Sequence, residues 1–185
     1  MSTHLPLPRI LVTGHTAEGR STFISDGPPH RVRTVEERPG YRVSNLWALF
    51  DSPAAIDDPD RVNEVAGLAP PPMGSLIRII DYPPEPADPV ERQKMFEAMF
   101  SKLFPDGRHL PPDAAHPGMH TTESVDYAIV LQGEIYAVME EGEKLMRAGD
   151  VLIQRGTAHA WSNRSGAFAR ICFVLIDGRR GASGD

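Results

Sequence analysis

The sequence has little cysteine, no excess of basic charge and no long apolar run. Its 185 residues include one cysteine, Cys172, so no disulfide can form within the chain. This suits a reducing compartment, and we expect a cytoplasmic protein. Basic residues number 19 against 25 acidic ones, a net charge of -6, which argues against a nucleic-acid partner. No run reaches the length of a membrane span and no signal peptide is visible, so we expect no membrane partner.

Several familiar catalytic motifs are missing as well. The chain contains no P-loop, no G-x-G-x-x-G after a strand, no G-x-S-x-G and no CxxC. We therefore expect no nucleotide cofactor. Cys172 lies in a strand-like apolar run, where a small buried side chain is the expected role rather than a nucleophile.

Proline and glycine are plentiful, at 18 and 16 residues, and they separate short apolar runs. The pattern is clearest between residues 119 and 177, where close, even spacing and tight turns indicate antiparallel strands in a small barrel or sandwich. The expected strands are Val125–Leu131, Ile135–Met139, Glu143–Met146, Val151–Gln154, Ala158–Ser162 and Phe168–Ile176.

The first half of the chain adds a hairpin and two longer strands. Arg9–His15 and Ser21–Ser25 flank a turn, and Tyr41–Phe50 and Ser75–Tyr82 are strand-like. An isolated hairpin is only marginally stable in water, so we expect it to pack on the barrel or on a partner subunit. The domain prediction is an arm over residues 1–35, a barrel over 36–178 and a disordered tail over 179–185.

One helix is expected after Asp88 and Pro89, which supply an N-cap and a first helical residue. Its apolar side chains recur at three- and four-residue spacing. They are Met95, Phe96, Met99, Phe100, Leu103 and Phe104. The stripe could cover a cavity as a lid, but packing on the outer barrel wall is the commoner arrangement, so we predict one outer helix.

The stretch from Met119 to Asp177 resembles the cupin superfamily. The second cupin motif, G-x5-P-x-G-x2-H-x3-N, resembles residues 149–163, with glutamine in place of the usual proline and the first glycine one residue closer to it. The matched residues are Gly149, Gly156, His159 and Asn163, and the glutamine is Gln154. The resemblance implies a mainly β fold, a double-stranded β-helix of the cupin or jelly-roll type.

The first cupin motif, G-x5-H-x-H-x3/4-E-x6-G, matches at His120 and Gly133. Asp126 stands where glutamate is usual, and Thr122 replaces the second histidine. In an extended strand His120, Thr122 and Asp126 share a face, as do His159 and Trp161.

Two imidazoles and a carboxylate suit a divalent transition metal. His120, Asp126 and His159 are therefore the candidate ligands, for iron, manganese, nickel or zinc. The missing histidine leaves a second interpretation open, in which the same side chains form a polar, metal-free cavity lining.

A ligand pocket beside these residues would be lined by Thr122, Trp161, Glu123, Tyr41 and Trp47, although barrel core or surface explains each one singly. His109 and His116 lie in a proline-rich loop and are expected to be solvated, with His116 near enough to His120 in sequence to serve as a substitute ligand.

The resemblance implies a small-molecule-binding cupin. One hypothesis is a metal-dependent enzyme of oxygenase, isomerase or decarboxylase type, acting on a small organic acid, ketone or aromatic compound. The other is a non-catalytic ligand-binding cupin, a sensor or accessory protein with a metal-free site. Because similar proteins pair their barrels and the hairpin needs a surface to cover, we expect a homodimer.

Overall fold

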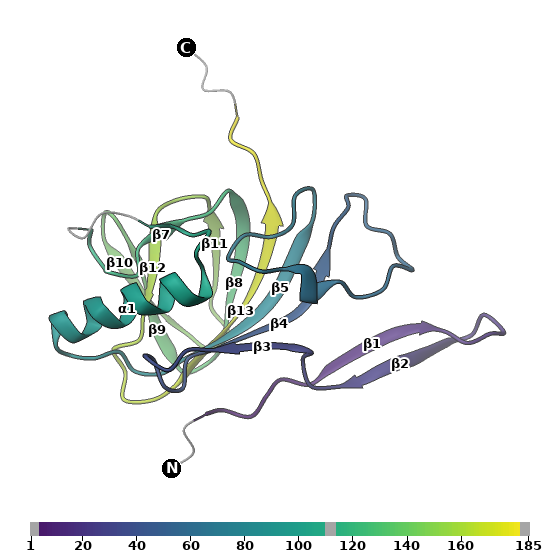
Figure 1. Cartoon of the computed structure of the whole chain (residues 1–185), viewed down its shortest axis with the longest axis horizontal. Helices are drawn as coiled ribbons and strands as arrows, with labels where there is room; N and C mark the ends of the chain where they lie inside the picture. Colours follow the sequence, from purple (N-terminus) through teal and green to yellow (C-terminus); the bar gives the residue numbers. More distant parts are fainter. Residues whose placement is uncertain (1–3, 110–113, 182–185) are drawn as a thin grey trace.

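The computed structural model describes residues 4–109 and 114–181, in which antiparallel strands are the main secondary structure (Figure 1). Every strand expected from the sequence is present, and Ser75–Tyr82 has the predicted bounds. The strands are β1 Ile10–His15, β2 Ser21–Gly27, β3 Arg31–Thr34, β4 Arg42–Leu49, β5 Ser75–Tyr82, β6 Arg108–His109, β7 His120–Thr121, β8 Ser124–Gln132, β9 Glu134–Met139, β10 Glu143–Arg147, β11 Val151–Arg155, β12 His159–Ser162 and β13 Ala169–Asp177.

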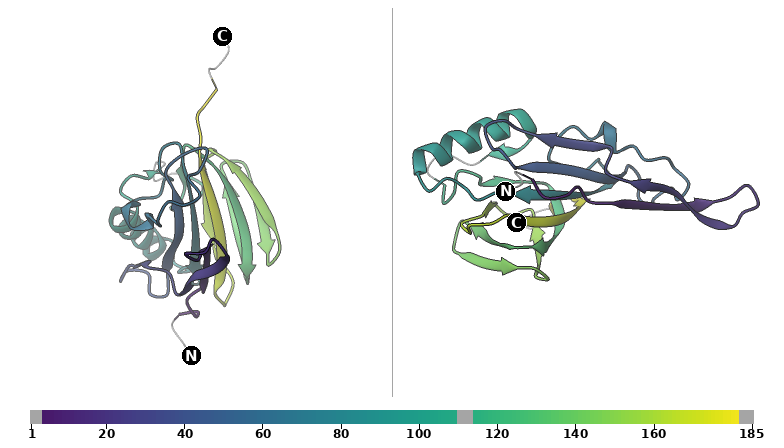
Figure 2. Two further views of the ribbon diagram at one scale, coloured as in Figure 1. Left: turned by 90° about the vertical axis from the view of Figure 1, so that its right-hand side faces the viewer. Right: turned by 90° about the horizontal axis from the view of Figure 1, so that it is seen from below.

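Two of the three sheets face each other and form the barrel. One has the order β11-β8-β13-β5-β4-β3, and the other has the order β10-β9-β12-β7-β6. A single apolar cluster joins their inner faces, with Ile135 and Trp161 from the smaller sheet and Ile80, Val130 and Phe173 from the larger one. The layers are separate in Figure 2, where the chain is seen from below. The mainly β, double-stranded β-helix fold is confirmed.

Strand β8 shows how the sequence selects the inner face. Its burial alternates along the strand, so Ser124, Asp126, Ala128 and Val130 point into the barrel. Because β8 lies between β11 and β13, Asp126 is placed in the interior of the larger sheet.

Helix α1, Pro89–Leu103, begins where the sequence predicts. The side chain of Asp88 accepts hydrogen bonds of 2.9 Å from the backbone N–H groups of Val90 and Glu91. The helix lies outside the two sheets, as predicted (Figure 1). Its apolar stripe does not cover the outer wall, however: Phe96 and Phe100 belong to the shared core and line the barrel cavity, as the lid interpretation requires.

The N-terminal arm stands apart from the barrel. Strands β1 and β2 form a two-stranded sheet of their own that extends away from the body in Figures 1 and 2. Strand β3, which the sequence analysis missed, pairs with β4 in the larger sheet, so the barrel begins before residue 36. The tail over residues 179–185 is predicted to be disordered. Its last four residues, 182–185, lie outside the described residues.

The residues before β1 are held against the barrel by hydrogen bonds from largely buried charged side chains. The carboxylate of Asp81 pairs with Arg42 and Arg170, both at 2.6 Å. These two guanidinium groups also donate hydrogen bonds of 2.6 Å to the backbone carbonyls of Leu5 and Pro6. The base of the arm is therefore fixed although its strands extend into solvent.

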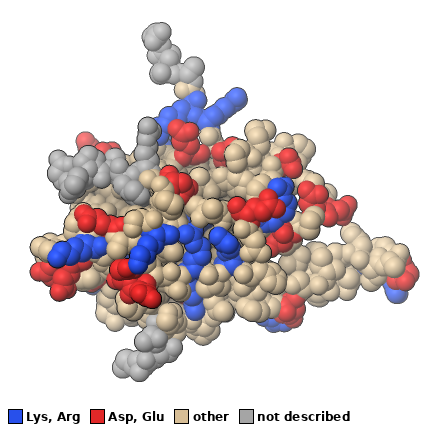
Figure 3. Space-filling model, viewed as in Figure 1, with Lys and Arg blue, Asp and Glu red and all other residues tan. Residues whose placement is uncertain are grey.

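The surface carries both signs of charge. On the face drawn in Figure 3, acidic side chains lie among the basic ones. No helix in the described part of the chain has the length and apolar character to cross a bilayer. The absence of nucleic-acid and membrane partners stays a prediction.

The homodimer also stays a prediction, and the arm supplies its test. Phe23 and Ile24 on β2 are 67% and 62% exposed. If the arm covers a partner subunit, replacing both with serine removes apolar contact area and shifts the protein toward monomer. Size-exclusion chromatography with light scattering measures the change, and Ser25→Ala on the same strand is the control. A wild-type monomer, or a double variant that remains dimeric, would contradict the prediction.

Candidate functional site

The barrel contains a cavity between its two sheets and helix α1. Residues of both sheets and of the helix line it. Most of its wall is apolar, and the helix contributes much of it. The apolar lining comprises Leu68, Ile80, Phe96, Met99, Phe100, Phe104, Trp161, Phe173 and Leu175.

Two histidines face each other across neighbouring strands of the smaller sheet. His120 on β7 is the direct partner of His159 on β12, and their ring centroids lie 4.4 Å apart. The Nδ1 of His120 is 2.9 Å from the carbonyl oxygen of Gly118. A carbonyl can only accept, so Nδ1 carries the proton. Metal-binding histidines are commonly oriented in this way.

The second ring has two neighbours at the same nitrogen. Nδ1 of His159 lies 3.0 Å from the carbonyl oxygen of Thr157, and the side-chain amide of Gln154 also contacts it. A proton on Nδ1 donated to Thr157 leaves the lone pair on Nε2, whereas donation from Gln154 places the proton on Nε2. Metal binding at Nε2 requires the first tautomer. Burial lowers the pKa of His159, with an opposing effect from Thr157, so the neutral ring is favoured.

Asp126 lines the same cavity from the larger sheet. Its side chain is 3% exposed, and Oδ1 has no hydrogen-bond partner among the described residues. Burial raises the pKa of the Asp126 carboxyl to about 6, although a hydrogen bond with Ser124 and the charge of Arg78 act in the opposite direction. An unpartnered buried oxygen is costly, which is the pattern expected of a group that meets a ligand.

The structure gathers most of the predicted site residues. Those on the cavity wall are Tyr41, His120, Thr122, Asp126, His159 and Trp161. The described residues contain no group of three or more histidine, cysteine, aspartate or glutamate side chains placed to hold a metal ion. The predicted metal set is thus brought together as a histidine pair, and Asp126 lines the same cavity from the other sheet without joining them in one cluster.

Two predicted pocket residues lie elsewhere. Trp47 lines a separate pocket beside Phe50 and Arg61, because the register of β4 shifts between Asn45 and Trp47 and breaks the alternation on which the prediction depended. Glu123 is exposed, because the residues on either side of it point inward.

Sequence reasoning also missed two cavity residues, Arg38 and Arg78, which are 2% and 1% exposed. The sequence could have indicated a special role for Arg78, because this residue interrupts the apolar run of strand β5. Arg38 lies in a turn before β4, where no periodicity applies.

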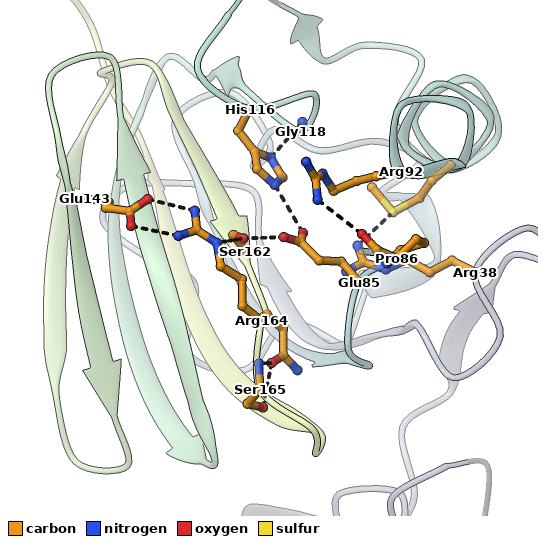
Figure 4. A network of polar contacts seen from close by, with 12 residues as sticks. Arg38, Glu85, Pro86, Arg92, His116, Gly118, Glu143, Ser162, Arg164 and Ser165 are labelled. Carbon is orange, nitrogen blue, oxygen red and sulfur yellow. Dashed lines mark hydrogen bonds and ion pairs between the residues drawn. The ribbon is translucent and has the colours of Figure 1, made fainter. Parts of the chain in front are cut away.

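His116 is buried rather than solvated, which corrects the prediction, and it belongs to a polar network (Figure 4). Its Nδ1 accepts a 3.0 Å hydrogen bond from the backbone N–H of Gly118, so its Nε2 carries the proton and donates to Glu85 at 3.1 Å. The other oxygen of Glu85 accepts from Ser162 at 2.5 Å. His116 does not line the cavity, and the side chain of His109 lies outside what the structure describes.

The carboxylate of Glu85 is kept ionised by this network. Burial is the largest influence and raises its pKa, but hydrogen bonds from His116 and Ser162 together outweigh burial, so the pKa falls below its ordinary value. Arg164 extends the network, donating to Ser162 and pairing with both oxygens of Glu143 at 2.7 Å.

Gly118 connects the network to the site. Its N–H donates to His116 and its carbonyl accepts from His120. A Cβ at this position would lie 2.8 Å from the ring of Phe96 on the helix, so only glycine allows this close approach.

We expect Gly118→Ala to lower the free energy of unfolding by about 1–3 kcal/mol, because Phe96 or the His116 ring must move. Urea denaturation measures the loss. Gly166→Ala is the matched control, since a Cβ there meets nothing within 4 Å. Equal stability of the two variants would contradict this account of the loop.

Asp126→Asn tests the buried carboxyl. The pKa of the Asp126 carboxyl is about 6 in the folded protein and about 3.9 in the unfolded chain. Between these pH values the folded protein therefore holds a proton that the unfolded chain has lost. The free energy of unfolding of the wild type falls as the pH rises through this range. The stability of D126N relative to wild type should therefore increase by about 3 kcal/mol from pH 4 to pH 8.

Urea denaturation with a chelator present measures this difference, and the exposed Asp57→Asn is the control. A D126N difference that is independent of pH would show that the carboxyl is not held in an apolar environment.

Comparisons with known proteins agree with this architecture. No protein-family model matches the chain. Oryzines biosynthesis cluster protein J of Aspergillus oryzae is 44% identical over 176 residues, covering 91% of this chain and 82% of the relative. Phomopsin biosynthesis cluster protein C' of Diaporthe leptostromiformis is 32% identical over 189 residues, covering 96% of this chain and 82% of the relative.

A third relative carries the family in its name. A cupin-domain-containing oxidoreductase of Aspergillus ruber is 29% identical over 175 residues, covering 90% of this chain and 70% of the relative. These similarities extend over nearly the whole chain, and they accompany a double-stranded β-helix whose two histidines occupy the cupin motif positions. The chain belongs to the cupin superfamily.

Proposed function

We propose that the protein is a cupin enzyme that converts a small organic molecule in the barrel cavity, using a divalent transition metal bound by His120 and His159. One observation carries the proposal: two imidazoles, each hydrogen-bonded to a backbone carbonyl, lie on the wall of a mostly apolar cavity together with a carboxyl group whose Oδ1 has no partner among the described residues. Convergent polar groups in an apolar pocket are typical of catalytic sites.

The residues fit such a metal in chemistry. Imidazole nitrogen suits iron, manganese, nickel and zinc, and a pair of histidines leaves coordination positions open for water and substrate. When bound, the metal would supply Lewis-acid polarisation of a substrate oxygen or activation of dioxygen.

The protein's own groups have separate tasks. Gly118 and Thr157 hold the two rings through their carbonyls. The carboxyl group of Asp126 lines the cavity, where it can take up or release a substrate proton. The phenylalanine face of α1 consists of Phe96 and Phe100 on the helix and Phe104 directly after its last residue. It excludes water from the reacting molecule.

Oxygenase, isomerase and decarboxylase reactions on a small organic acid, ketone or aromatic compound are all compatible with this arrangement. The names of the relatives favour oxidation, because one is called an oxidoreductase, and two others are named for biosynthesis clusters. We therefore place oxygenase chemistry first among the three.

A second candidate function is ligand binding without catalysis. It is favoured by the absence of a third clustered ligand among the described residues and by the amide of Gln154 next to His159. In this case the same polar wall would hold a ligand through hydrogen bonds alone.

Metal analysis separates the two. After supplementation with iron, manganese, nickel or zinc, we expect near-stoichiometric metal in the wild type and a several-fold loss in His120→Ala and in His159→Ala, because each removes one imidazole ligand. Elemental analysis gives the content, and His15→Ala, on an exposed position of β1, is the control.

Circular dichroism confirms that each variant is folded. A folded wild type without metal after supplementation would reject the enzyme proposal in favour of ligand binding. Unchanged metal content in both histidine variants would show that any metal is held elsewhere.

A further inference from the structure

The two arginines on the cavity wall have unused hydrogen-bonding capacity. Arg38 and Arg78 are almost fully buried, yet each has two guanidinium nitrogens without a partner among the described residues: Nε and Nη2 of Arg38, and Nε and Nη1 of Arg78. The bonds they do make are weak or few. Arg38 donates to the sulfur of Met99 at 3.6 Å, as Figure 4 shows, and Arg78 donates to the carbonyl of Gly67 at 3.0 Å.

Aromatic rings, rather than carboxylates, surround both guanidinium groups. Arg38 lies 4.8 Å from the ring centroid of Tyr41 and 4.9 Å from that of Phe96. Arg78 lies 5.8 Å from the centroid of Phe104. Such cation–π contacts offset part of the cost of burying a charge, but they leave the N–H donors unsatisfied.

Two acidic groups whose charges act on these arginines, Glu85 and Asp106, are committed to other partners. Glu85 accepts from His116 and Ser162, and Asp106 accepts from the backbone N–H groups of Leu68 and Ala69. No ion pair involving Arg38 or Arg78 is found in the described parts of the chain. Burial lowers the pKa of Arg78 to about 10, so the group stays protonated at neutral pH.

The cavity thus contains two positive charges against one carboxyl group, that of Asp126. An unpaired buried charge is strongly unfavourable, and natural proteins keep such groups where a ligand completes them. The fork of N–H donors on arginine matches the two oxygens of a carboxylate. The rest of the lining is aromatic and aliphatic, which suits an apolar ligand body.

We propose that Arg38 and Arg78 form a carboxylate-binding subsite, and that the substrate is a small organic carboxylate with an aromatic or alkyl body. The proposal rests on the proposed function only in that the same cavity holds the substrate. Arg38 and Arg78 bind and orient the carboxylate, and the apolar body lies against the phenylalanine face of the helix and Trp161. The opposite end of the molecule then faces His120 and His159.

Matched pairs of carboxylates and primary amides test this directly, because each pair differs in charge but hardly in shape. The probes are benzoate with benzamide, phenylacetate with phenylacetamide, and octanoate with octanamide. We expect at least one carboxylate to bind the chelator-treated wild type, measured by calorimetry and thermal shift, and its amide to bind about ten- to hundredfold more weakly.

The variants are Arg38→Met and Arg78→Met, which keep the length of the stem and remove the charge. Each should weaken carboxylate binding by about tenfold or more and weaken amide binding less, so that the preference for carboxylate over amide falls. Arg33→Met is the matched control, since Arg33 lies 5.9 Å from the centroid of the same Phe104 ring but does not line the cavity. Arg38→Lys and Arg78→Lys keep the charge and provide folded alternatives if the methionine variants fail to fold.

The outcomes separate this proposal from the enzyme proposal. Carboxylate binding that persists in metal-free protein and in His159→Ala supports the subsite even if the metal assay fails. Equal binding of carboxylates and amides, no binding of any probe, or carboxylate binding that survives in both methionine variants would overturn the subsite. The metal result would be unaffected.

Discussion

The exclusion of water by the phenylalanine face of helix α1 is the constraint on which the site depends. Phe96, Phe100 and Phe104 cover the cavity and leave its polar groups in an environment of low dielectric constant. In water the carboxyl of Asp126 and the two arginines would be ordinary ionised side chains. Behind this face, burial raises the pKa of Asp126, lowers that of His159 and leaves guanidinium donors without partners in the described part of the chain. The chemistry of the cavity therefore follows from its closure.

The same helix is connected to the histidine pair by a short loop. Gly118 lies against Phe96 and contacts His116 with its N–H and His120 with its carbonyl. Glu85 anchors the far end of this chain of hydrogen bonds, because it accepts from both His116 and Ser162. A residue just after strand β5 thus orients an imidazole on β7 in the opposite sheet. Such indirect support is what keeps a metal-binding or catalytic ring in a fixed tautomer.

Much of this could be predicted from the sequence, and the exceptions have physical causes. Simple alternation placed His120, Thr122 and Asp126 on one inner face and His159 with Trp161 on another, and all five line the cavity. Alternation failed at Trp47, because a register shift in β4 turns the side chain away from the cavity. Loop residues were harder to place from the sequence, because side chains in loops do not alternate in a regular pattern.

The buried side chains that alternation could not place were those held by tertiary contacts. His116 is buried because Glu85, distant in sequence, pairs with it. Arg38 and Arg78 were missed because buried arginines without ion pairs are rare, and only the position of Arg78 within an apolar strand indicated one. The stripe on α1 was recognised, but a sequence pattern shows that a helix has an apolar face and not what that face covers.

We propose that a small organic anion completes the buried polar wall of the barrel. The decisive experiment is a crystal structure of the protein grown with benzoate. The account predicts electron density for one molecule inside the cavity, with its carboxylate oxygens within hydrogen-bond distance of Arg38 and Arg78 and its ring against Phe96 or Phe100. A cavity that stays empty, or a benzoate bound with its carboxylate away from both arginines, would contradict it.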